Sequence, residues 1–169
     1  MRSAVALGAI VIAIAIQTTL ATYIFRGSST TIDLVLIVVV YIAIKSGPVT
    51  GLLAGTVAGL IQDALSSGIL GIGGLAKTIV GFLSGLLGTQ FIMTAPLPRF
   101  VLLVVATALH AAIFMGLYTL LNLRQFPAPY PAIVGQAFGN AFVGVVTFQV
   151  IEWFPGFVDR RRAGRFLKR

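Results

Sequence analysis

The residues that could carry acid–base or charge chemistry are few and lie far apart in the chain. The sequence has four Asp and Glu residues and one His. Asp63 and Lys77 flank a turn rich in serine and glycine, so two helices joined there would bring them to similar depths. We therefore expect Asp63 and Lys77 to approach each other, directly or through water. Such a contact is a structural ion pair, a polar cluster that contacts a ligand or partner, or part of a proton or ion path.

Three further polar residues stand in otherwise apolar segments. His110 has no second histidine or cysteine near it, which favours a hydrogen-bonded packing role over a metal site. Gln136 and Asn140 are four apart, share a helix face, and are expected to hydrogen-bond to another helix. No nucleophile, histidine and acid occur in a plausible catalytic arrangement, so we expect no enzyme activity, catalytic residue or cofactor.

The composition indicates that most of this chain lies in lipid. Its 169 residues are 58% apolar and 9% charged, against about 25% charged residues in a typical soluble domain. Mean hydropathy is +1.04. Such a chain cannot cover a surface that faces water, which excludes a soluble enzyme, a nucleic-acid-binding domain and a disordered segment.

The apolar segments predict an all-α integral membrane protein with a bundle of about six transmembrane helices. We expect one domain over 1–154 with spans at 4–25, 30–44, 48–65, 70–93, 98–121 and 131–154, followed by a basic cytoplasmic tail over 155–169. The second span has a short apolar part, so Asp33 is expected at the membrane interface, capping the helix. A five-span arrangement is the alternative.

The distribution of basic residues predicts the orientation. Nine Lys and Arg residues fall on the side of both termini and two on the other, which favours cytoplasmic N- and C-termini. Six of the nine lie in the tail: Arg160, Arg161, Arg162, Arg165, Lys168 and Arg169. We expect these residues to contact anionic lipid or, alternatively, a cytoplasmic protein, and not nucleic acid.

Glycines recur at helical spacing in the third and fourth predicted spans. The third carries Gly47, Gly51, Gly55 and Gly59, and the fourth carries Gly74, Gly81 and Gly85. Small residues at this spacing let two helix backbones approach closely. The glycines serve either packing inside the bundle or docking of a helix from another protein.

The segment from Gly55 to Gly71 resembles the central motif of the MreD family of rod shape-determining proteins. In that motif a glycine-spaced helix ends in a pair such as Gln62–Asp63, and a small-residue turn with Leu70–Gly71 follows. Lys77 departs from the family pattern.

The resemblance implies a non-enzymatic, multi-pass protein of the bacterial inner (cytoplasmic) membrane. It would bind the single-pass protein MreC and influence its conformation within the cell-elongation machinery for peptidoglycan synthesis (the elongasome). MreB, RodA and a class B penicillin-binding protein would belong to the same assembly. The family also resembles the substrate-binding subunit fold of energy-coupling-factor transporters. The alternative function is therefore a vitamin-like binding subunit of a transporter, with Asp63, Lys77 and the glycine-rich turn at its pocket.

Overall fold

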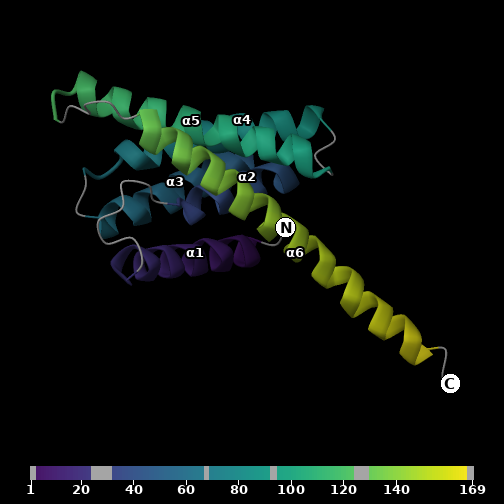
Figure 1. Cartoon of the computed structure of the whole chain (residues 1–169). Coiled ribbons are helices and arrows are strands. Elements are labelled where there is room, and N and C mark those ends of the chain that lie inside the picture. The colour runs from purple at the N-terminus through teal and green to yellow at the C-terminus, as the bar shows by residue number, and fades with distance from the viewer. Residues whose placement is uncertain (1–2, 24–31, 67–68, 92–94, 124–129, 167–169) are drawn as a thin grey trace.

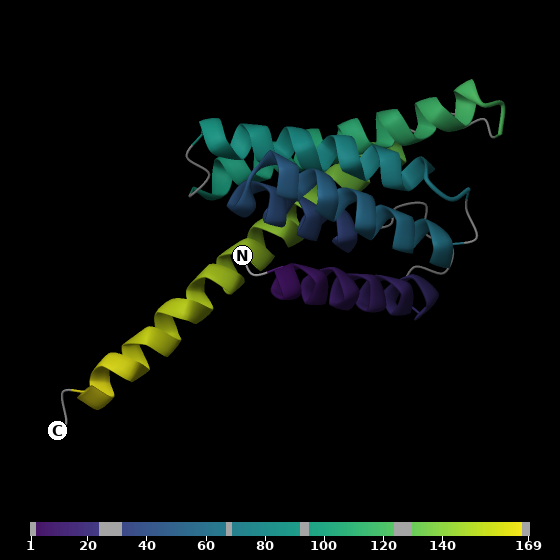
Figure 2. The same cartoon turned by 180° about the vertical axis from the view of Figure 1, so that it is seen from behind.

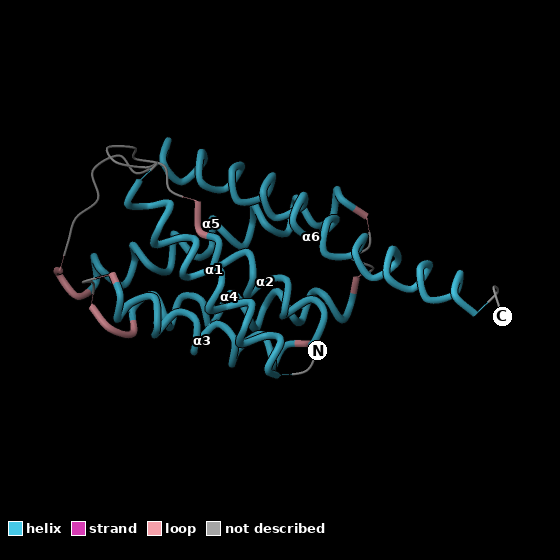
Figure 3. Tube along the Cα trace, turned by 90° about the horizontal axis from the view of Figure 1, so that it is seen from below, coloured by secondary structure: helices cyan, strands magenta, loops and turns pink. Residues whose placement is uncertain are grey.

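The computed structural model describes residues 3–23, 32–66, 69–91, 95–123 and 130–166, and its regular secondary structure is entirely α-helical there (Figures 1 and 3). The helices are α1 (Ser3–Tyr23), α2 (Leu34–Ser46), α3 (Pro48–Leu65), α4 (Ile72–Gln90), α5 (Pro96–Leu120) and α6 (Tyr130–Phe166). The expectation of an all-α protein with six helices is confirmed.

The helices run up and down through one bundle. Helices α1, α3 and α5 end on the side where α2, α4 and α6 begin (Figures 1 and 2). Helix α6 crosses the bundle obliquely and continues beyond it, so the backbone of the basic tail as far as Phe166 extends the last helix (Figure 2).

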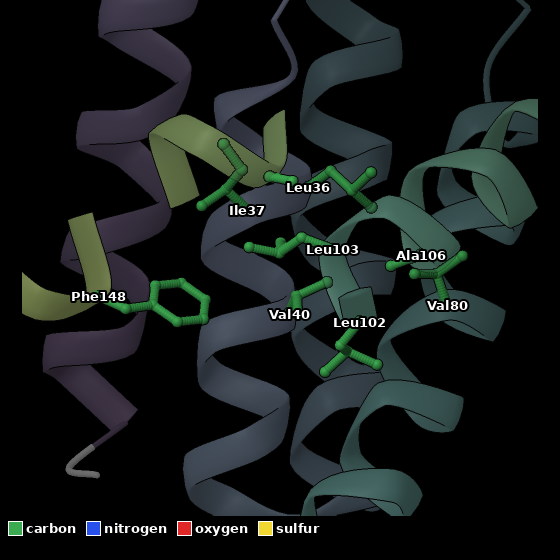
Figure 4. Packing of buried hydrophobic residues seen from close by; sticks show 9 residues of the cluster. Leu36, Ile37, Val40, Val80, Leu102, Leu103, Ala106 and Phe148 are labelled. Atoms are coloured by element: carbon green, nitrogen blue, oxygen red, sulfur yellow. The ribbon is translucent and has the colours of Figure 1, made fainter. Parts of the chain in front are cut away.

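Helix α2 is the centre of the bundle, because each of the other five helices contacts it. Its 13 residues are nearly all apolar, and a helix that is apolar on every side belongs in an interior. Leu36, Ile37 and Val40 of α2 meet Leu103 of α5 and Phe148 of α6 in the main core cluster (Figure 4). At 1.5 Å per residue α2 is about 20 Å long, shorter than the hydrocarbon core of a bilayer.

The two ends of α2 are set by local chemistry. Asp33 is its N-cap, and one carboxylate oxygen accepts a hydrogen bond from the Leu36 backbone N–H at 2.9 Å. Gly47 ends the helix at φ 90°, a left-handed conformation that glycine adopts without steric cost. Pro48 then opens α3, where its missing N–H has no helical acceptor to lose.

Helices α3 and α4 pack backbone against backbone through their glycines. A Cβ atom at Gly51 would overlap the Gly81 carbonyl, one at Gly55 the Lys77 carbonyl, and one at Gly59 the Gly74 backbone. A hydrogen bond of 2.8 Å joins the hydroxyls of Thr56 and Thr78 across the same interface. The glycine face of α3 is thus buried inside the protein, and it is not open to a helix from another chain.

Helix α1 lies at the edge and contacts α2 and α3. Ile10, Ala13 and Ile14 face inward, while Val11 and Ile12 are about 60% exposed. Gln17 fixes its far end by accepting a hydrogen bond from the Val35 backbone N–H at 3.1 Å.

Within the described residues, four helices could cross a membrane by length and composition: α3, α4, α5 and the Tyr130–Trp153 part of α6. The apolar stretches of α1 and α2 are shorter. The predicted bounds of α3 match the structure. Helix α2 starts later than predicted because Asp33 caps it, and α5 starts earlier because Pro96 and Pro98 both fit its first turn.

Replacing Gly55 with leucine should lower the free energy of unfolding by about 3 kcal/mol, since the new side chain meets backbone that cannot move aside. Unfolding in mixed micelles measures the loss. Gly116→Leu is the control, because a Cβ there meets nothing within 4 Å. Equal stability of the two variants would contradict the close α3–α4 contact.

Candidate functional site

A buried ion pair lies where α2 begins. Lys77 Nζ of α4 is 2.7 Å from Asp33 Oδ2, and the two side chains are 4% and 6% exposed. The same Nζ is 3.1 Å from Nε2 of His110 on α5. An ammonium group has only donors, so His110 Nε2 is the acceptor and the ring proton is on Nδ1. Lys77 thereby ties three helices together.

The ion pair continues into a chain of neutral hydrogen bonds. The Asp33 backbone N–H donates to Asn140 Oδ1 of α6 at 2.8 Å, and Asn140 Nδ2 donates to Thr107 Oγ1 of α5 at 3.1 Å. Asp33, Lys77, Thr107, His110 and Asn140 are all buried, and we refer to them as the central polar network. The network pairs the Asp33 carboxylate, the Asn140 amide and two of the Lys77 ammonium protons, which would be costly if left unpaired in a low-dielectric interior.

The expected direct contact between Asp63 and Lys77 is not formed, and this part of the prediction is wrong. Asp63 Oδ2 instead accepts hydrogen bonds from the backbone N–H groups of Gly71 and Gly74, at 2.9 and 3.0 Å. These donors lie at the start of α4, where free N–H groups and the positive end of the helix dipole attract a carboxylate. Asp63 therefore caps α4, and Lys77 pairs with Asp33 and His110.

Sequence reasoning missed the part that Asp33 plays in the network, and it did not single out Thr107. The capping of α2 by Asp33 was predicted, whereas its burial inside the protein, at 5% exposure, was not. The available signal was the short apolar stretch of α2. A helix this short does not reach as far as its longer neighbours, so a residue at its N-terminus lies among their side chains.

A pocket of about 660 Å³ opens where α2, α4 and α6 begin, and we call this the pocket end of the bundle. Asp33, Lys77 and His110 line it, together with Asp63 and Gln136. The wall is formed by residues of α1, α3, α4, α5 and α6 and by Asp33, the N-cap of α2; Gln17 is the contribution of α1. The predicted polar residues Asp63, Lys77, His110 and Gln136 are thus brought to one site, although their predicted pairing differs.

A second charged cluster lies at the opposite end, and sequence reasoning did not predict it. Glu152 of α6 forms ion pairs with Lys45 of α2 and with Arg99 of α5, the latter at 2.8 Å. Arg99 is 2% exposed, and its guanidinium carbon lies 5.9 Å from the centre of the Phe148 ring. This cluster clamps three helices at the end away from the pocket.

The remaining predicted residues lie elsewhere. Gly47 forms the turn between α2 and α3, Gly81 packs on Gly51, and Gly85 packs on Pro48. The side chains of Arg160, Arg161, Arg162 and Arg165, and all of Lys168 and Arg169, lie outside the described residues.

Apolar helices of this length, packed through glycines around a buried polar network, define a multi-pass α-helical membrane protein. The chain matches the family model of the rod shape-determining protein MreD over residues 2–151, and it belongs to that family. Comparisons with curated proteins and with solved structures gave no match. The expected likeness to the substrate-binding subunits of energy-coupling-factor transporters therefore stays a prediction.

Membership of this family indicates the general function of the protein. MreD proteins act in rod shape determination, and the family is one of shape-determining proteins that is not known for enzyme activity.

The first site prediction concerns the ion pair. Lys77→Met should lower the free energy of unfolding by about 3–5 kcal/mol, because it leaves the Asp33 carboxylate buried without its cation. The double variant Asp33→Asn, Lys77→Met should regain at least about 1 kcal/mol of this loss. Unfolding in mixed micelles of the unchanged protein, both single variants and the double variant gives the coupling free energy between Asp33 and Lys77. Additive losses would show that the two residues do not interact.

The second concerns the opposite end. Glu152→Ala should lower the free energy of unfolding by about 2 kcal/mol, because it removes the carboxylate that faces Lys45 and Arg99. Glu152→Gln should lose less, since an amide oxygen still accepts from Arg99. If Glu152→Ala were as stable as the unchanged protein, the cluster would not hold α6 to α2 and α5.

Proposed function

We propose that this protein is a non-enzymatic membrane scaffold of the bacterial cell-elongation machinery, which binds MreC and influences its conformation. The observation that carries the proposal is the family match, which covers every helix through residue 151. In this proposal the protein resides in the inner membrane with both termini cytoplasmic. MreB, RodA and a class B penicillin-binding protein belong to the same assembly for peptidoglycan synthesis, and the basic tail contacts anionic lipid.

The bundle is suited to hold a partner in one conformation. The glycine contacts join α3 to α4, and the two polar clusters fix α2, α5 and α6 at both ends. A rigid surface that binds one conformation of MreC better than another shifts MreC toward that conformation.

The partner helix cannot use the glycine faces of α3 and α4, because these faces are buried against each other. We place it on the outer face of α6, which contacts α5 and α2 on its inner side. An apolar ridge runs along this face at every fourth residue, with exposures of 45–69%: Val134, Phe138, Phe142, Val146 and Val150. Rows with this spacing fit the grooves of a second helix, and aromatic side chains are favoured at such contacts.

Photo-crosslinking tests the proposal in living cells. A photoreactive phenylalanine analogue in place of Phe142 should form a crosslink to MreC. The same group in place of Ile12, which is 61% exposed on α1, should not. Immunoblotting of the purified, tagged protein identifies the adduct.

Two results would count against the proposal. Failure to recover MreC with the tagged protein from gently solubilised membranes would contradict MreC binding itself. Recovery of MreC with crosslinks only from α1 would retain the function and reject the α6 surface.

The pocket favours the second candidate function, a small-molecule binding subunit of a transporter. This function needs an ATPase-linked coupling subunit as a partner. Recovery of such a subunit in place of MreC would select it.

A further inference from the structure

Two hydrogen-bond donors remain at the floor of the pocket. Lys77 has three ammonium protons, of which Asp33 and His110 accept two. His110 Nε2 accepts from Lys77, so its Nδ1 carries a proton for which the structure gives no acceptor among the described residues. Both side chains line the pocket. Lys77 and His110 can therefore donate hydrogen bonds to a molecule in the pocket that carries acceptors.

The charges around the pocket disfavour an anion. Lys77 and Asp33 cancel each other as an ion pair. Asp63 is the other charged side chain in the pocket lining, and it leaves the site with one excess negative charge. An anionic ligand would lose its hydration and meet this repulsion. The acceptors that suit the floor are consequently neutral ones, such as carbonyl oxygens.

One wall of the pocket is aromatic. The His110 and Phe114 rings are stacked with centroids 6.0 Å apart, and Tyr118 lies 4.8 Å beyond Phe114. All three rings come from successive turns of α5 and line the pocket. The planes of His110 and Phe114 differ by 23° and those of Phe114 and Tyr118 by 42°, so the rings form an apolar aromatic wall against which a planar molecule can pack.

Other residues of the lining supply carboxamides, which can both donate and accept. Gln17, Gln62 and Gln136 come from three different helices. Gln62 Oε1 is buried and accepts no hydrogen bond from the described residues. A buried polar atom without a partner is uncommon in folded proteins, and a ligand that donates to it would satisfy it.

We propose that this pocket binds a neutral, planar heterocycle whose ring carbonyl groups accept hydrogen bonds from Lys77 and His110. The ring lies along the aromatic wall of α5, and its edge meets the glutamine side chains. A volume of about 660 Å³ accommodates a molecule of two or three fused rings. The proposal assigns a ligand site to the pocket and deepens the second candidate function, although it is equally compatible with a scaffold that responds to a ligand.

Lumichrome, a neutral and fluorescent tricyclic dicarbonyl, is the probe. The full chain in nanodiscs of zwitterionic lipid should bind it with a dissociation constant in the micromolar range, above the signal of empty nanodiscs. Flavin mononucleotide has a similar dicarbonyl ring but carries a phosphate, and it should bind at least about tenfold more weakly. Absence of lumichrome binding, or equal or tighter binding of flavin mononucleotide, overturns the proposal.

A matched pair of variants locates the site. Met115→Trp fills the pocket from α5 and should weaken lumichrome binding by at least about tenfold. Leu120→Trp on the same helix is the control, since Leu120 is 77% exposed and lies outside the lining. If Met115→Trp does not fold, Gln136→Ala takes its place as a milder change in the lining, and it should also weaken lumichrome binding. Unchanged binding in the folded pocket variants would place the probe elsewhere and reject the site.

MreC recovery is a separate measurement, so failure of the ligand proposal is distinguishable from failure of the scaffold proposal.

Discussion

The need to keep a buried lysine charged and satisfied is the constraint on which the rest of this structure depends. Lys77 has almost no exposure, and its ammonium meets Asp33 and His110 inside the bundle. Removing a charge from water is costly, and the cost is offset only where partner groups are fixed in place. The partners come from α2 and α5, and Asn140 adds α6 through the Asp33 backbone. The central polar network therefore determines how four helices meet.

The same constraint explains how far the sequence could predict this protein. Local signals gave the six helices, the bounds of α3, and the capping role of Asp33. The glycine spacing gave a close helix contact but left its partner open, and the structure shows that α4 fills it. The pairing of Asp63 with Lys77 was inferred from depth in one hairpin. It failed because depth says nothing about rotation, and Lys77 faces α2 and α5 while Asp63 caps α4.

The two ends of the bundle differ in a way that relates to function. At one end Glu152, Lys45 and Arg99 close the contact among α2, α5 and α6. At the other end the central polar network leaves an open pocket with donors at its floor. A protein of the MreD family with this organisation can present a fixed lipid-facing surface to a partner helix while its pocket end stays accessible to a small molecule. The two proposals thus use different parts of one rigid bundle.

The protonation of His110 tests the central claim most directly. The chain has one histidine, so selective ¹⁵N-histidine labelling of protein that carries no histidine tag gives the signals of a single ring. The network predicts a neutral ring with the proton on Nδ1 and a hydrogen-bonded Nε2, whose shift changes in Lys77→Met. A proton on Nε2, or a ring protonated on both nitrogens, would contradict the contact between Lys77 and His110 and with it the network.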